Sequence, residues 1–371
     1  MQKLSCLPQD AVVWGQGVLS AAAAALPAYG LVRPITFTVE PLRPLYAAQL
    51  APHIQDSAGV FTDFPPHVPD TAVRAALQAA RAGGAAAIVA LGGGSVLDAA
   101  KAVSHLHQQE TGRHLPIAAF ATTLSGSEYS HYFGITETGG AQKFKRSYAV
   151  RETVPRLVVT DPLLVQGTPR ALLLASAIKG IDHAVEGMRQ VGRDHPHAIL
   201  AASGAQRLLG VLERWPRTGE TQQALDAGLV TLDDLLQLQL GAWQCYFYPA
   251  SVVYGLSHRI GHILGGTFGL PHSATSCITL APVIQACAAR YGDRFEGFAP
   301  GRGAAAATQL AARIAGTVAH LGLPTRLRDF GLDAAHLPEI ARLLLAHYPA
   351  EVADLGDGAE TKLHALLEAL W

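Results

Sequence analysis

The sequence has little charge, and it contains no long apolar run. Charged residues make up 15% of the 371 residues, and the formal net charge is −1 at pH 7. A nearly neutral chain lacks the basic surface that binds nucleic acid or an anionic membrane. No apolar run approaches the ~18 residues of a membrane span. The first residues, MQKLSCLPQD, contain no signal-peptide core, because Pro8 and Asp10 interrupt them. We therefore expect no nucleic-acid partner and no membrane partner.

Cysteine is also scarce. Cys6, Cys245, Cys277 and Cys287 lie far apart and form no CxxC pair. In a chain of this length, that pattern favours reduced thiols in a cytosol over a disulfide framework. Hydrophobic residues make up 49% of the chain, enough for a large core, and the length fits two domains. These features predict a cytoplasmic globular protein.

The organisation of the chain changes near residue 155. Before it, strand-like runs alternate with an Ala-rich helix, at 34–40, 69–82, 86–95, 115–123 and 156–162. This alternation favours a parallel sheet flanked by helices. Beyond it, Ala- and Leu-rich segments indicate helices at 168–191, 197–213, 222–247, 251–265, 275–290, 303–321 and 335–347. We predict an α/β nucleotide-binding domain over 1–157 and an all-helical domain over 158–371.

A glycine-rich corner, VALGGGSVLDAAKAV, lies at 89–103. An apolar strand ends in Gly92, Gly93 and Gly94, and a helix is predicted to begin at Ser95. Glycine allows a ligand to approach the backbone closely, and a helix N-terminus offers free N–H groups to an anion. The stretch matches neither GxGxxG nor a Walker loop. Gly-rich turns of this kind are also common structural corners, so by itself the motif leaves a diphosphate site and a plain turn both open.

A second loop, ATTLSGSE at 121–128, follows the next predicted strand. Its hydroxyl groups belong to Thr122, Thr123, Ser125 and Ser127, and Gly126 can serve as a hinge. Ser and Thr favour capped loops in any protein. If the two strands are parallel neighbours, however, this loop forms the second wall of a nucleotide crevice.

Histidines mark the second half of the chain. His258 and His262 are one helical turn apart in HRIGH, and His272 follows a Gly-Leu-Pro break. His183 lies in SAIKGIDHAVEG, four residues after Lys179. A single histidine is usually structural, and 16 histidines also produce chance pairs. If the four imidazoles converge, they form a metal site or an acid–base site.

Together these stretches resemble the iron-containing (group III) alcohol dehydrogenase family, and most closely its maleylacetate reductase-like branch. The matching motifs are GGGSxxDxAK at 92–101, TTxxGSE at 122–128, a lysine (Lys145) ten residues before Pro155, HAxE at 183–186, HxxxH…PH at 258–272 and GLPTRLRDFG at 322–331. The resemblance implies a Rossmann-like NAD(P)-binding domain and an all-α domain in a dehydroquinate synthase-like architecture, with the substrate between them. We expect a homodimer.

The resemblance also implies a cofactor site in the first domain. The residues expected to bind NAD(P)H are Gly92, Gly93, Gly94, Ser95, Asp98, Thr122, Thr123, Ser125 and Lys145. Glu40, at the end of the ITFTVE strand, can bond to the adenosine ribose and repel a 2′-phosphate, which favours NAD over NADP. A glutamate at a strand end is also often only a solvated residue.

Lys179 departs from the metal-dependent members of the family. They use one Asp and three His; carried over, the histidines are His183, His258 and His272, but Lys179 occupies the Asp position. An ammonium repels a divalent ion and offers no lone pair. Asp182 is expected to pair with Lys179 at i, i+3 instead. Three imidazoles can still hold zinc, so metal binding is weakened and not excluded. Maleylacetate reductases also lack this Asp and are regarded as metal-free, although an asparagine is expected where Lys179 stands.

The expected reaction is hydride transfer from NAD(P)H to a carbonyl or enone of a small, carboxylated substrate. Lys179 is expected to stabilise the developing alkoxide, and His258 or His262 to supply the proton. His183 and His272 complete a positive-leaning pocket. One alternative is an iron- or zinc-dependent alcohol or aldehyde dehydrogenase of the same family. The other is an NAD-using lyase or cyclase related to dehydroquinate synthase.

Overall fold

The structure, a computed structural model, describes residues 3–65, 68–138 and 144–371. It divides into two compact units. Unit 1 is the chain up to Thr168 together with Tyr248–Ala250, and unit 2 consists of Pro169–Phe247 and Ser251–Trp371. The domain boundary predicted after residue 157 lies inside unit 1, because it falls within the last strand of the sheet and the short helix α5 (Pro162–Val165) also belongs to this unit.

Unit 1 contains a six-stranded parallel sheet with the strand order β1-β8-β5-β4-β2-β3. The strands are β1 (Ala11–Trp14), β2 (Pro34–Phe37), β3 (Gly59–Phe61), β4 (Ala87–Gly92), β5 (Ile117–Ala121) and β8 (Leu157–Thr160). An antiparallel hairpin of β6 (Tyr132–Glu137) and β7 (Phe144–Ala149) lies outside this sheet. Every residue of β4 and β5 is buried, as expected for central strands covered on both faces.

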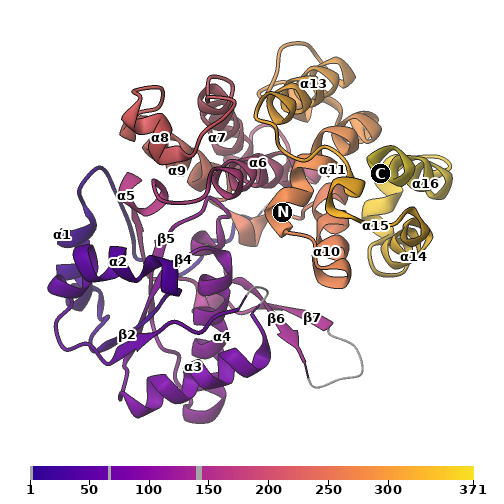
Figure 1. The fold of residues 1–371 in the computed structure, drawn as a ribbon. Helices are drawn as coiled ribbons and strands as arrows, with labels where there is room; N and C mark the ends of the chain where they lie inside the picture. The colour runs from indigo at the N-terminus through magenta and orange to yellow at the C-terminus, as the bar shows by residue number, and fades with distance from the viewer. Residues whose placement is uncertain (1–2, 66–67, 139–143) are drawn as a thin grey trace. The chain divides into compact units, whose positions relative to one another are not determined.

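Helices pack on this sheet (Figure 1). The helices of unit 1 are α1 (Leu19–Ala24), α2 (Arg43–Leu45), α3 (Asp70–Ala82), α4 (Gly94–Thr111) and α5, of which α3, α4 and α5 contact strands of the sheet. In α3 the buried residues Val73, Ala76, Leu77 and Ala80 follow the i, i+3, i+4, i+7 spacing of one helix face. The α/β fold class predicted for the first domain is therefore confirmed.

The described secondary structure of unit 2 is entirely helical, which confirms the second part of the predicted fold class. Its α-helices are α6 (Arg170–Glu186), α7 (Pro196–Leu212), α8 (Thr221–Asp226), α9 (Leu232–Cys245), α10 (Leu256–Phe268), α11 (His272–Ala286), α12 (Ala288–Tyr291), α13 (Ala304–His320), α14 (Leu337–His347), α15 (Pro349–Val352) and α16 (Ala359–Leu370). Helix α6 is central: it contacts α7, α9, α10 and α11, and it is buried from Leu173 to Glu186. Among the described residues, none of the helices combines the length and apolarity needed to cross a bilayer.

Several elements differ from the sequence prediction. The strand predicted at 34–40 ends at Phe37, and Glu40 begins a 3-10 turn. The helix predicted at 222–247 is interrupted between α8 and α9, where Gly228 adopts a φ of 67°. The helix predicted at 275–290 begins earlier, at His272, directly after Pro271. The sequence analysis did not predict β1, β3, the hairpin or α16.

Helices α7 and α9 pack closely because two glycines face each other. A Cβ atom on Gly204 would lie 2.7 Å from the carbonyl oxygen of Gly241 and 2.8 Å from Sγ of Cys245. A Cβ atom on Gly241 would lie 2.9 Å from Cγ of Leu208. By contrast, Gly210 on α7 is exposed and has nothing within 4 Å of its Cβ position.

Two alanine substitutions in α7 should therefore change stability in opposite directions. Gly204→Ala should lower the free energy of unfolding by roughly 1–3 kcal/mol, because backbone and sulfur atoms must move apart. Gly210→Ala should raise it by up to about 1 kcal/mol through helix propensity alone. Urea unfolding followed by circular dichroism measures both changes. Equal shifts in the two variants would show that the α7–α9 contact tolerates a side chain.

Candidate functional site

The glycine corner and the Ser/Thr loop lie side by side. β4 and β5 are parallel neighbours, with Gly92 opposite Ala121, and the amide of Thr122 donates to the carbonyl of Gly92 at 3.0 Å. β2 flanks β4 on its other side. The carboxyl ends of adjacent parallel strands are where nucleotides bind in open α/β sheets. The condition set in the sequence analysis for a shared crevice is therefore met.

The three glycines are needed for space and not for an unusual backbone conformation. Gly92, Gly93 and Gly94 all lie outside the positive-φ region. A Cβ atom on Gly93 would lie 2.9 Å from Cγ2 of Thr123, and one on Gly94 would lie 3.2 Å from Oγ of Ser125. Helix α4 begins at Gly94, one residue before the predicted start, and no side chain caps its N-terminus. The N–H groups of its first turn thus begin directly at the glycines, and such a helix start can bind an anion.

Asp98 accepts hydrogen bonds from the Ser/Thr loop and from the first strand of the hairpin. Its Oδ1 accepts a hydrogen bond from Oγ of Ser127 at 2.8 Å, and its Oδ2 accepts one from the amide of Gly134 at 3.2 Å. Lys101, fully buried, donates to the carbonyls of Ser127 at 2.6 Å and Tyr132 at 2.9 Å. Lys101 ends the predicted GGGSxxDxAK motif, but no function was predicted for it. Both residues of α4 therefore fix the end of the Ser/Thr loop at Ser127.

The remaining predicted cofactor residues are Ser95, Glu40 and Lys145, all in unit 1. Ser95 is exposed in the first turn of α4. The carboxylate of Glu40 is 72% exposed, with its Oε2 3.8 Å from Nη1 of Arg43. Lys145 pairs with Thr136 in the β6–β7 hairpin, and its side chain lies outside the described part of the structure.

Glu128, at the end of the same loop, is a buried carboxyl group. Its side chain is 4% exposed, and Oε2 has no hydrogen-bond partner among the described residues. Burial raises the pKa of Glu128 to about 7, although the nearby Lys101 ammonium opposes this shift. The folded protein therefore retains a proton here that the unfolded chain releases at lower pH.

The second site is a cluster of four histidines in unit 2. The ring centroid of His258 lies 5.4 Å from that of His183, 4.5 Å from that of His262 and 5.9 Å from that of His272. The rings of His262 and His272 are 5.5 Å apart. The histidines come from α6, α10 and the first residue of α11, and these helices contact one another. All four predicted histidines thus converge. His183 additionally stacks on Tyr246 at 4.1 Å.

Lys179 lies beneath this cluster and is 2% exposed. Its Nζ is 2.7 Å from Oδ2 of Asp182 and 2.9 Å from Nδ1 of His258. The predicted i, i+3 pairing of Lys179 with Asp182 is confirmed. Oδ2 of Asp182 also accepts a hydrogen bond from Oγ of Ser276 on α11 at 2.8 Å. The contact with His258 was not foreseen, because it depends on the packing of α6 against α10.

His183 and His258 add no positive charge to the pocket, contrary to the prediction for His183. Burial, reinforced by the Lys179 ammonium, holds the pKa values of His183 and His258 well below the usual histidine range. Burial alone would raise the pKa of Asp182, but Lys179 and the bonds around it keep this pKa well below its ordinary value. Those two imidazoles are therefore neutral at pH 7, and the lysine charge is balanced by Asp182.

Glu186 positions the helix that carries His258 and His262. Its Oε2 accepts a hydrogen bond from the amide of His258 at 3.1 Å, and its Oε1 accepts one from the hydroxyl of Tyr291 at 2.7 Å. This places a buried carboxyl group at the N-terminus of α10, where N–H groups lack partners within the helix. Glu186 was predicted only as part of the HAxE motif. A glutamate in an otherwise apolar helix is a signal that hydrogen-bond donors must surround its carboxyl group.

Nitrogen atoms of His258, His262 and His272 lie within 4.8 Å of one another and offer a possible metal site. This set contains His262 in place of the His183 expected from the family pattern. Three imidazoles suit zinc in principle. However, a ligating histidine normally donates its second ring N–H to an acceptor, whereas Nδ1 of His258 faces an ammonium. The residues around His258 therefore fit a metal ion poorly.

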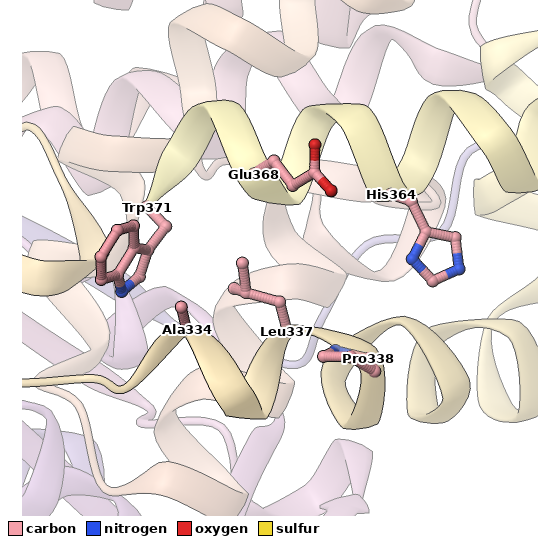
Figure 2. A pocket seen from close by; sticks show the side chains of 6 residues that line it. All are labelled: Ala334, Leu337, Pro338, His364, Glu368 and Trp371. Atoms are coloured by element: carbon pink, nitrogen blue, oxygen red, sulfur yellow. The ribbon is translucent and has the colours of Figure 1, made fainter.

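Two surface cavities of about 300 Å³ each are separate from these clusters. Figure 2 shows the first, between α14 and α16; its lining residues are Ala334, Leu337, Pro338, His364, Glu368 and Trp371. The second lies in unit 1, beside α3 and the hairpin. Neither is lined by a predicted site residue, so the histidine cluster and the glycine corner remain the candidate sites.

Comparison with known proteins decides the family. Residues 8–162 match the model of the iron-containing alcohol dehydrogenases, and residues 247–369 match the C-terminal model of the same family. The chain belongs to the iron-containing alcohol dehydrogenase family. It is 33% identical over 270 residues to the maleylacetate reductase of Pseudomonas sp. (strain P51), covering 72% of this chain and 71% of that protein. The resemblance to the maleylacetate reductase-like branch is thereby confirmed, and the protein is an oxidoreductase.

Solved structures confirm the fold. A putative alcohol dehydrogenase from Ralstonia eutropha JMP134 is 30% identical, with a TM-score of 0.82 and coverage of 100% of this chain and 98% of that chain. A sulfoacetaldehyde reductase from Bifidobacterium kashiwanohense, determined in complex with NAD+, is 20% identical, with a TM-score of 0.80 and coverage of 100% and 98%. The second identity is low enough that this structure supports the fold alone.

The buried carboxyl group of Glu128 should make stability depend on pH. Its folded pKa, about 7, lies above the ordinary value of 4.5, so its contribution to stability falls as pH rises from about 5 through 7. Glu128→Gln removes this titration. From pH 5 to pH 8 the variant should gain roughly 2 kcal/mol relative to the wild type. Urea unfolding across that range measures the difference. Glu360→Gln, at an exposed position of α16, is the control, and parallel curves for Glu128→Gln would contradict the prediction.

Proposed function

We propose that the protein reduces a carbonyl or enone of a small, carboxylated substrate with NADH and without a metal ion. The observation that carries the metal-free assignment is the 2.9 Å contact between Nζ of Lys179 and Nδ1 of His258, which places an ammonium against a candidate metal ligand. Similarity to maleylacetate reductases favours a 4-oxo-2-enoate of that type as the substrate. Because His183 and His258 are neutral and Asp182 balances the charge of Lys179, the carboxylated class rests on this similarity.

The cofactor is proposed to bind at the glycine corner of unit 1. The cradle of Gly92, Gly93 and Gly94, with the uncapped N-terminus of α4, supports a diphosphate there. Thr122, Thr123 and Ser125 form the adjoining wall, with Asp98 holding that loop, and Ser95 and Lys145 remain proposed contacts. The exposed carboxylate of Glu40 follows β2, the neighbour of β4, and favours NAD over NADP because it repels a 2′-phosphate.

The histidine cluster is proposed to polarise the substrate oxygen and supply the proton. NADH, when bound at the glycine corner, would supply the hydride that the substrate carbon accepts. An N–H of His258 donates a hydrogen bond to the oxygen as negative charge develops there. His262, whose ring is 4.5 Å from that of His258, relays the proton that completes the reduction. His183 and His272 border the same space, and the full protein is proposed to act as a cytoplasmic homodimer.

One observation favours a second candidate function. The nitrogen set of His258, His262 and His272 is compact enough to hold zinc or iron. If it does, the protein is a metal-dependent alcohol or aldehyde dehydrogenase of the same family. An NAD-using lyase or cyclase remains an alternative from another reaction class, which would release product without net consumption of NADH.

Metal analysis and an NADH-oxidation screen test the proposal together. The purified protein should contain well below one metal ion per chain, and it should oxidise NADH in the presence of oxo-enoates, oxo-acids, ketones or aldehydes. The rate should be unchanged after dialysis against a chelator, and NADH should be preferred over NADPH. Stoichiometric iron or zinc, with activity lost in chelator, would establish the metal-dependent alternative instead. Turnover without net NADH oxidation would indicate the lyase class.

Gly94→Val should weaken NADH binding while the protein stays folded. The new side chain meets Ser125 and occupies the space proposed for the diphosphate. Loss of one charge-assisted hydrogen bond, at about 1.5–3 kcal/mol, corresponds to a loss of roughly 10–100-fold in affinity. Calorimetric titration with NADH measures it. Gly316→Val, at an exposed glycine of α13 with open space around it, is the matched control. An unchanged affinity in folded Gly94→Val would remove this site from the proposal.

A further inference from the structure

The hydrogen bond between Lys179 and His258 has only one consistent direction. Lys179 is paired with Asp182 at 2.7 Å inside unit 2, so it is an ammonium and has donors only. It therefore donates to Nδ1 of His258, and Nδ1 must carry a lone pair. A neutral imidazole has one N–H and one lone pair. The ring proton of His258 is thus left on Nε2.

The surroundings hold Lys179 in this orientation. Oδ2 of Asp182 is fixed by Ser276 from α11 as well as by Lys179. The backbone of His258 is fixed independently, because its amide donates to Glu186. Lys179 and Asp182 are almost completely buried, so water does not compete for these bonds. Lys179 is therefore also held by Asp182, and His258 is also held by Glu186.

We propose that Lys179 is a positioning residue that holds the ring proton of His258 on Nε2. In this form the ring can donate a hydrogen bond to a substrate oxygen, as neutral imidazoles do in other enzymes. It cannot bind a metal ion, because Nε2 has no lone pair and Nδ1 is occupied. The catalytic consequence rests on the proposed function, but the position of the proton does not. Lys179 itself need not contact the substrate, which its burial makes difficult.

Nuclear magnetic resonance of the full-length protein with ¹⁵N-labelled histidine tests the inference without any substrate. The His258 signals are assigned by their loss in His258→Gln. The wild type should show a protonated Nε2 and an unprotonated Nδ1. Lys179→Met keeps the length of the side chain but lacks the donor. In this variant the Nε2–H form should no longer dominate, because Oδ2 of Asp182, 3.7 Å from Nδ1 of His258, can then accept from an Nδ1–H. Ser276→Ala removes a neighbouring bond to Asp182 but not the contact with His258, so it should retain the wild-type pattern.

Two results would overturn the inference: a proton on Nδ1 of His258 in the wild type, or an unchanged Nε2–H form in folded Lys179→Met. If that variant fails to fold, the wild-type spectrum alone still decides. Under the proposed function, Lys179→Met should lower kcat by about 10²-fold, with KM nearly unchanged. Absence of any reductase activity would count against the proposed function and leave the spectra valid, so the two failures are distinguishable.

Discussion

The buried ion pair between Lys179 and Asp182 determines what the helical unit can do. Two charges at this depth require close partners, since removal of either one leaves an uncompensated charge that costs about 3–5 kcal/mol. Asp182 takes its second bond from α11, through Ser276, and Lys179 takes its second from α10, through His258. The pair therefore ties three helices together at one point. The convergence of the histidines follows from these connections.

One face of α6 supplies this whole arrangement. Lys179, Asp182 and Glu186 recur at the three- and four-residue spacing that keeps side chains on one side of a helix. Lys179 bonds to the ring of His258, and Glu186 bonds to its backbone amide. An imidazole held through both its ring and its main chain has little freedom to rotate. Such preorganisation matters for catalysis, because hydrogen-bond donors that are already aimed need no rearrangement during the reaction.

The sequence predicts the local parts of these sites better than their long-range contacts. The pairing of Lys179 with Asp182 follows from helical spacing alone, whereas the contact with His258 requires the packing of α6 on α10. The glycine corner was recognisable, but only the side chains of Thr123 and Ser125 show that space, and not backbone conformation, demands glycine there. Asp98 was predicted to line the cofactor crevice, and its bond to Ser127 could not be foreseen because it joins α4 to a loop 29 residues further on. The edge strands β1 and β3 were missed; both are partly exposed, whereas the predicted strands β2 and β8 are fully buried.

A lysine and a carboxylate at position 179 have opposite effects on the same imidazole. In the family pattern, an aspartate there gives a lone pair to a metal ion, and the metal polarises the substrate oxygen. A lysine instead donates a hydrogen bond to the lone pair of Nδ1 of His258. Under the proposed function, the ring then polarises the substrate oxygen through its Nε2–H. The ammonium can strengthen that donor, because linked hydrogen bonds polarise one another in a site with little water. Under the proposed function, Lys179 replaces the metal ion indirectly. It polarises the ring of His258, which donates the hydrogen bond to the substrate oxygen, and Asp182 balances the charge of Lys179.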